Sequence, residues 1–181
     1  MENLKKQIQL AVDAFKSGRI LEAEDLTRKL IDSNPKVVFL YNLMGLILAE
    51  QKEIDQALQY YEKGIKIDSN FAEIYNNMGI LFYKNKYSGN AKKIEDFYKR
   101  SISLNENISE PHSNLGNLYN SQNKHVEAIK CYKKAIEINP KFSFALLNLA
   151  SLYLSLGNID DAKKTLEEAI RISPNMIEAH R

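Results

Sequence analysis

The residue types that most often carry catalysis or metal binding are sparse in this chain. It contains three histidines, which lie far apart in the sequence, and a single cysteine, Cys131. It has no His-Glu-x-x-His pair, no paired cysteines and no glycine-rich phosphate loop. His112 and His180 share a recurring position that other copies fill with tyrosine or leucine, which favours packing, and Cys131 has no pair of basic neighbours to activate its thiol. We therefore expect no catalytic residue, no metal site and no cofactor.

Asparagine is the side chain whose spacing suggests a chemical role. Asparagines recur in apolar segments of helical pattern, at Asn42, Asn76, Asn77, Asn114, Asn117, Asn120 and Asn148. A side-chain amide both donates and accepts hydrogen bonds, so it matches the amide and carbonyl groups of an extended peptide whatever that peptide's side chains are. The asparagines therefore predict sequence-tolerant peptide binding.

A repeat of 34 residues places these asparagines. Gly45 and Gly79 are 34 residues apart, as are Pro140 and Pro174, whereas Gly116 follows Gly79 by three residues more. Five repeats align over residues 4–37, 38–71, 72–108, 109–142 and 143–176, and residues 177–181 begin a sixth. Repeat positions are counted from Leu4, Val38, Ala72, Ser109 and Ser143.

Each repeat is predicted to form two antiparallel helices, at about positions 1–14 and 18–31. Apolar residues recur three and four apart, as in Leu40, Met44 and Ile47, and no alternating strand pattern competes with them. Positions 8, 20 and 27 hold mostly small residues, as expected where two helices approach closely. One such pair cannot bury its own apolar face, so the sequence predicts an all-α fold of stacked repeats.

These recurring residues resemble the tetratricopeptide repeat (TPR) family. The best single copy is the fourth repeat, with Leu115, Gly116, Tyr119, Ala128, Tyr132, Ala135 and Pro140. The resemblance covers essentially the whole chain and implies one right-handed superhelical solenoid over residues 1–181. The chain departs from the family pattern at position 32, where Ser69 and Glu106 replace proline, and at position 4, which holds Gln7, Tyr41, Tyr75, His112 and Leu146.

The third repeat contains three additional residues near Ser88–Ile94. Its small position 20 is Ala91 when counted forward and Ile94 when counted backward. Three residues make nearly one helical turn, so either the connecting loop is longer or the second helix gains a turn at its start. We interpret the insertion as a tolerated surface loop, with a specific contact site as the alternative.

The resemblance implies that the first helix of each repeat lines a concave groove. The candidate peptide-binding residues on that face are Asn42, Asn76, Asn77, Asn114, Asn117, Asn148, Phe39 and Tyr83. Asn77, Asn114 and Asn148 share position 6, so stacking would place them as successive rungs. The alternative is that asparagine at position 6 is common in the family and serves hydrogen bonding between repeats.

Composition and charge exclude several classes of partner. The chain has 181 residues, 44% of them hydrophobic, and 25 Lys and Arg against 23 Asp and Glu, which leaves a net charge of +2. That charge is too small to indicate nucleic acid or an anionic membrane as the partner. No segment approaches the length of a transmembrane helix, and with one cysteine and no apolar signal core we expect a cytoplasmic protein.

The predicted function is a protein-interaction scaffold that binds an extended peptide or partner protein, without catalysis. The cationic clamp of TPR adaptors for acidic chaperone tails is absent, because Leu46, Glu110 and Asn114 occupy clamp positions. The stacked asparagines are similar to the repeat region of O-linked N-acetylglucosamine transferases. This similarity implies an alternative function as the substrate-recruiting arm of a multi-domain glycosyltransferase or sulfotransferase-like enzyme. Because the sequence stops five residues into a repeat, we also expect either further sequence or self-association through the uncapped end.

Overall fold

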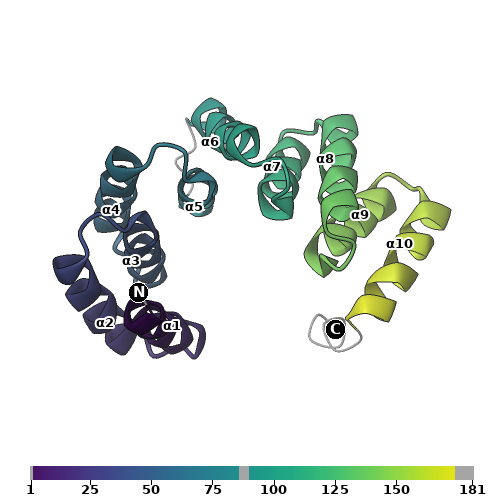
Figure 1. Cartoon of the computed structure of the whole chain (residues 1–181). Helices are drawn as coiled ribbons and strands as arrows, with labels where there is room; N and C mark the ends of the chain where they lie inside the picture. Colours follow the sequence, from purple (N-terminus) through teal and green to yellow (C-terminus); the bar gives the residue numbers. More distant parts are fainter. Residues whose placement is uncertain (1, 86–89, 174–181) are drawn as a thin grey trace. The chain divides into compact units, whose positions relative to one another are not determined.

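The computed structural model describes residues 2–85 and 90–173. Within these ranges the chain forms ten α-helices and no β-strand (Figure 1), which confirms the predicted all-α fold class. The helices are α1 (Glu2–Lys16), α2 (Ile20–Ser33), α3 (Val38–Glu50), α4 (Ile54–Ile67), α5 (Ala72–Lys84), α6 (Ala91–Leu104), α7 (Ser109–Ser121), α8 (His125–Ile138), α9 (Ser143–Ser155) and α10 (Ile159–Ile172). The start of the predicted sixth repeat, 177–181, lies outside the described residues.

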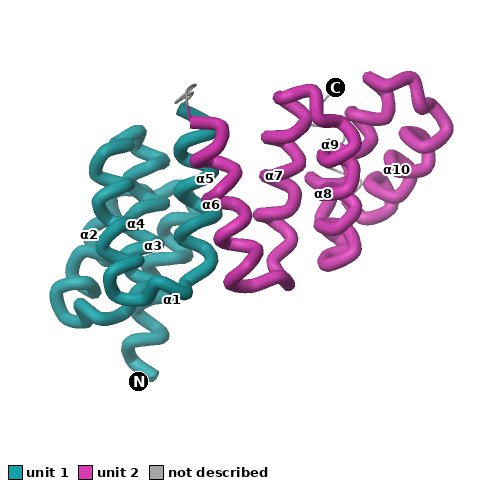
Figure 2. Tube along the Cα trace, turned by 90° about the horizontal axis from the view of Figure 1, so that it is seen from above, with its two compact units in different colours: residues 1–85 teal, residues 86–181 magenta. Residues whose placement is uncertain are grey.

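The chain divides into two compact units, residues 1–85 and residues 86–181 (Figure 2). In unit 1, α1 packs with α2 and α3 packs with α4 as helical hairpins, and α5 contacts both α3 and α4. In unit 2, the hairpins are α7 with α8 and α9 with α10, and α6 packs on α7. We call the odd-numbered helices A helices and the even-numbered ones B helices. Within each unit, successive A helices contact one another, α1 with α3, α3 with α5, and α7 with α9.

Alanines at positions 8 and 20 form the seam between an A helix and its B helix. They have no exposed surface at Ala11, Ala23, Ala57, Ala128, Ala150 and Ala162. In unit 1, Ala11 and Ala23 share a core cluster with Leu40 of the next hairpin, and in unit 2 Ala128 shares one with Leu149. Each hairpin therefore completes its core against its neighbour, as expected for a repeat that cannot bury its apolar face alone.

Glycine at position 8 makes room for a tyrosine at position 24 of the same hairpin. A methyl group added at Gly116 would lie 2.7 Å from Cε1 of Tyr132, and one added at Gly45 would collide with the ring of Tyr61. Both tyrosines are about 1% exposed. Where position 8 is alanine, position 24 of the same repeat is smaller than tyrosine: the first repeat has Ala11 and Thr27, and the fifth has Ala150 and Leu166. The side chains at positions 8 and 24 therefore share a limited volume, and a larger residue at one position requires a smaller one at the other.

The turn between the two helices of a hairpin depends on one residue in the left-handed backbone region, at position 15. Gly18 and Gly157 have φ angles of +74° and +76°, which glycine adopts without cost. Lys52 and Asn123 have φ angles of 65° and 59° at the same position. Asparagine tolerates this conformation, whereas lysine is strained in it.

Successive hairpins in unit 1 are tied by a side chain at position 4. The Tyr41 hydroxyl donates a hydrogen bond to the main-chain carbonyl of Pro35 at 3.0 Å, and the Tyr75 hydroxyl donates one to the carbonyl of Ser69 at 3.1 Å. Both acceptors are at position 32 of the preceding repeat. The bond is therefore the same whether that position holds proline or serine.

His112 occupies position 4 in unit 2, where Tyr41 and Tyr75 lie in unit 1. Its Nε2 is buried and has no hydrogen-bond partner among the described residues. Burial lowers the pKa of this imidazole, an effect that the nearby main chain of Glu106 opposes, while Lys134 lowers and Glu137 raises the pKa to a smaller extent. Burial therefore disfavours the charged form of this side chain.

The helix bounds locate the three additional residues of the third repeat. Helix α5 has 13 residues, as do α3, α7 and α9, and α6 has 14, as do α4, α8 and α10. Ile94 is 5% exposed and bonds to the carbonyl of Asn90, as Ala57 bonds to Glu53, whereas Ala91 is exposed. Ile94 therefore takes position 20, and the additional residues lie in the connection between α5 and α6.

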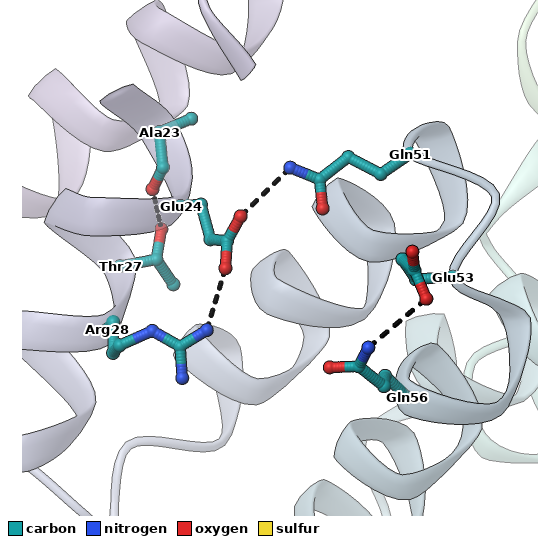
Figure 3. A network of polar contacts seen from close by, with 7 residues as sticks. All are labelled: Ala23, Glu24, Thr27, Arg28, Gln51, Glu53 and Gln56. Atoms are coloured by element: carbon teal, nitrogen blue, oxygen red, sulfur yellow. Dashed lines mark hydrogen bonds and ion pairs between the residues drawn. The ribbon is translucent and has the colours of Figure 1, made fainter. Parts of the chain in front are cut away.

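Glutamates at position 21 add a polar tie between hairpins. In unit 1, the Glu24 carboxylate on α2 accepts hydrogen bonds from Gln51 Nε2 at 2.9 Å and from Arg28 at 2.7 Å (Figure 3). These bonds, the one from Gln51 most, hold the pKa of Glu24 below its usual value. In unit 2, Glu95 on α6 accepts a hydrogen bond from the Tyr119 hydroxyl on α7 at 3.1 Å.

Across residues 2–85 and 90–173, no helix combines the length and the apolar character that a membrane-spanning segment needs.

Replacing Gly116 with alanine should destabilise unit 2. The new methyl group must displace the Tyr132 ring, and we expect a loss of about 1–3 kcal/mol in the free energy of unfolding, measured by urea denaturation. The double variant Gly116→Ala/Tyr132→Leu recreates the alanine and leucine combination of the fifth repeat. Its loss of stability should therefore be smaller than the sum of the losses in the two single variants. Strictly additive losses of stability would contradict the conclusion that positions 8 and 24 share one space.

Replacing His112 with tyrosine should stabilise the chain and flatten its pH dependence. Because the pKa of His112 is lower in the folded chain than in the unfolded one, the unfolded chain binds more protons below about pH 6.5. Stability is therefore lost as the pH falls from about 6.5 through the folded-state pKa. His112→Tyr should remove that loss and add about 1 kcal/mol by bonding the carbonyl of Glu106.

The measurement is urea unfolding at about pH 7.5 and about pH 5.5. His112→Phe keeps a ring without a hydroxyl, so it should flatten the pH dependence without adding the hydrogen bond. His125→Gln is the matched control and should behave as the wild type does. An unchanged loss of stability at the lower pH in His112→Tyr would show that His112 is not its source.

Candidate functional site

The asparagine side chains of the A helices form a pair in unit 1. Asn77 Nδ2 on α5 donates a hydrogen bond to Asn42 Oδ1 on α3 at 2.8 Å. Asn42 is 5% exposed, whereas Asn77 is half-buried. The bond therefore uses one donor of Asn77 and fixes the orientation of its amide, whose carbonyl oxygen and second N–H point away from that bond.

Unit 2 contains a related pair between α7 and α9. Asn148 Nδ2 donates a hydrogen bond to Asn117 Oδ1 at 2.9 Å, and the Tyr132 hydroxyl donates a second one to the same oxygen at 2.7 Å. Asn148 and Asn117 are both half-buried. Asn77 and Asn148, both at position 6, therefore each donate to an asparagine of the preceding A helix, at position 5 in unit 1 and at position 9 in unit 2.

The other predicted binding residues differ in accessibility. Asn76 is 9% exposed, Asn114 is half-buried, and Tyr83 is 38% exposed. Phe39 is partly buried and packs against the core cluster of unit 1. Asn120 lies 3.2 Å from His125 Nδ1. Of the predicted set, Asn77 and Tyr83 in unit 1 and Asn114, Asn117 and Asn148 in unit 2 thus combine a polar group with exposed surface.

A pocket of about 420 Å³ opens on the A helices of unit 1 beside the amide pair. It is formed by α1, α3, α4 and α5 together with the turn after α3, and it contains Asn77. Its other lining residues are Phe15, Leu46, Ala49, Glu50, Lys52, Ile54, Tyr61, Ile80, Leu81, Lys84 and Asn85. The pocket is of the size that small-molecule or side-chain sites have, about 300–1,000 Å³.

The charged residues of this pocket were not predicted from the sequence. Glu50 and Lys84 occupy position 13 of successive repeats, and Lys52 is the left-handed residue of the turn after α3. Position 13 lies on the first helix of each repeat, which was predicted to line the groove, so Glu50 and Lys84 could have been found there. The predicted binding residues were amide and aromatic side chains, and no charged residue was among them.

The groups with altered pKa values do not form a catalytic arrangement in residues 2–85 and 90–173. Burial raises the pKa of the Cys131 thiol to about 11, which keeps it protonated and unreactive. Burial likewise raises the pKa of Tyr61. Nor do these ranges hold a group of three or more His, Cys, Asp or Glu side chains placed to bind a metal.

One curated protein that the chain resembles is a glycosyltransferase. The chain is 34% identical over 85 residues to the UDP-N-acetylglucosamine–peptide N-acetylglucosaminyltransferase of Caenorhabditis elegans. The match covers 47% of this chain but only 7% of that protein.

Solved structures with the same fold include three that cover most of this chain. PilF of Pseudomonas aeruginosa has a TM-score of 0.83 and 20% identity, over 95% of this chain and 77% of that one. MamA has a TM-score of 0.70 and 23% identity, over 93% and 96%. YrrB, described as a TPR protein with an unusual peptide-binding site, has a TM-score of 0.63 and 20% identity, over 96% and 89%.

Family models match the repeats themselves. The tetratricopeptide repeat model matches residues 109–142, a second model of that description matches residues 131–164, and a TPR repeat model matches residues 45–86. Together these ranges span more than half of the chain. With helical hairpins repeating in both units, these matches show that the chain belongs to the tetratricopeptide repeat family.

Proposed function

We propose that this chain is a non-catalytic protein-interaction scaffold that binds extended peptides along its A helices. The Asn77 amide carries the proposal. It is half-buried, lines the unit 1 pocket and is held in one orientation by its hydrogen bond to Asn42. A polar group fixed in this way loses little conformational entropy when a peptide binds to it.

The amide has the hydrogen-bonding capacity that a peptide backbone requires. After the bond to Asn42, Asn77 retains an acceptor oxygen and one N–H donor. A peptide in extended conformation presents carbonyl and N–H groups at regular intervals, so one such amide engages the main chain irrespective of sequence. Asn42 is then a positioning residue, because it is buried and acts through Asn77.

Unit 2 offers a second amide of the same kind. Asn148 is half-buried and oriented by Asn117, which also accepts a hydrogen bond from Tyr132. The recurrence of the arrangement in both units favours a role in binding, although the same bonds also join neighbouring repeats. Binding and inter-repeat bonding are compatible, since each bond uses only one of the two donors of the position 6 amide.

The relatives support the class of function. YrrB is described as having a peptide-binding site, and its fold matches this chain over 96% of the chain's length. Proteins built from these repeats act typically as scaffolds, and we extend that role to this chain. A cytoplasmic location, and the absence of nucleic acid and membrane partners, are part of the same proposal.

The match to the Caenorhabditis elegans transferase favours a second candidate function. The repeats would then recruit substrates for a glycosyltransferase whose catalytic domain is encoded elsewhere in a longer reading frame. Sequencing the complete reading frame that contains residues 1–181 tests this alternative. A transferase domain in that frame would support it, and a frame without one would contradict it.

Peptide binding can be tested with a phage-displayed library of random linear peptides and the chain of residues 1–181. The selected peptides should bind Asn77→Ala and Asn148→Ala about threefold to tenfold more weakly in fluorescence titrations, because each change removes hydrogen bonds to the peptide backbone. N-methylation of single peptide bonds should weaken binding to the wild type while leaving every peptide side chain in place.

Asn70→Ala and Asn107→Ala are matched controls, since both asparagines are exposed in the loops between repeats. They should bind the peptides as the wild type does. Thermal unfolding of each variant separates a lost binding group from a lost fold. Equal binding by Asn77→Ala, Asn148→Ala and the wild type would remove the amides from the mechanism, and a library that yields no peptide would contradict the proposed function itself.

A further inference from the structure

We infer that the unit 1 pocket selects peptides in which an apolar side chain is flanked by an acidic one. This inference rests on the proposed function and adds a preference to it. Asn77 would engage the backbone, the floor of the pocket would bury the apolar side chain, and Lys52 and Lys84 would bind the carboxylate.

The floor of the pocket is apolar and remains accessible. Phe15 of α1, Leu46 of α3 and Ile80 of α5 line it, and all three are only partly buried. They come from three successive A helices, so the pocket is complete within unit 1. Burying an aliphatic side chain there removes apolar surface from water, which anchors one residue of a peptide.

The rim of the pocket carries two lysines and one glutamate. Lys52 and Lys84 are exposed, and neither forms an ion pair within the part of the chain that the structure describes. Elsewhere, lysines such as Lys29 and Lys99 are paired with a carboxylate of their own helix. The two rim lysines are therefore available to an incoming anion.

The sign of the net charge on the rim decides whether the pocket favours acidic or basic peptides. Glu50 opposes the lysines, yet two positive charges against one negative charge leave the rim positive. The bound peptide would cover the rim and exclude part of the water, which strengthens attraction to a carboxylate and makes a lysine or arginine unfavourable. The lysines are at position 15 of the second repeat and position 13 of the third, and neither is at a clamp position occupied by Leu46, Glu110 or Asn114.

The test is the peptide library, selected in parallel on the wild type and on Lys52→Glu/Lys84→Glu. The wild type should enrich Asp and Glu next to an apolar residue, and the variant should lose or reverse that enrichment. Replacing the acidic residue of a selected peptide with its amide should weaken binding to the wild type about tenfold, and replacing its apolar residue with serine should weaken it at least as much.

Two control variants make the outcome specific. Lys63→Glu/Lys66→Glu changes the net charge by the same amount on α4 outside the pocket, and it should select the wild-type peptides. Glu50→Gln removes the opposing charge, so it should strengthen binding of acidic peptides. Affinity for these peptides should also fall as the salt concentration rises.

The outcomes separate the inference from the proposed function. Selected peptides that lack acidic residues, or that are shared by the wild type and Lys52→Glu/Lys84→Glu, would overturn the inference and leave peptide binding intact. Peptides enriched in Lys and Arg would overturn it as well. A library that yields no binding peptide on the wild type would overturn the proposed function, and the inference with it.

Discussion

The architecture depends on how closely the two helices of a hairpin approach each other. Alanine or glycine at position 8 and alanine at position 20, where the third repeat alone has Ile94, set that distance, and the residue at position 24 fills the remaining space. Tyr61 and Tyr132 fit only because Gly45 and Gly116 lack a side chain. With the hairpin core closed in this way, the outer surfaces of the A helices are available for polar groups such as Asn77 and Asn148.

The fold could be predicted from the sequence because each constraint falls on one repeated position. Small residues at positions 8 and 20 and an aromatic or aliphatic residue at position 24 are visible in a single chain. The register of the third repeat could not be settled in this way, because Ala91 and Ile94 are both acceptable residues for a helix. Only the helix bounds decide for Ile94, since they reveal which of the two is buried.

The site was less predictable, because it depends on distances between repeats. The sequence indicated the asparagines but not that Asn42 is buried while its partner Asn77 reaches the surface. It also did not distinguish position 5 from position 9 as the acceptor, a difference that separates Asn42 from Asn117. The charged residues of the rim lie at helix ends, Glu50 on α3 and Lys84 on α5, and in the turn after α3, Lys52. At such places the direction of the chain is hardest to infer from the sequence pattern alone.

The hydrogen bonds from Tyr41 and Tyr75 end on main-chain carbonyls, at Pro35 and at Ser69. Every residue has a main-chain carbonyl, so the side chain at position 32 does not take part in joining the hairpins. The residue type at position 32 can therefore vary without changing how the hairpins pack. Substitutions at position 32 can change the polarity of the surface while the spacing of the helices stays constant. The positions of the A-helix side chains relative to one another then stay constant as well.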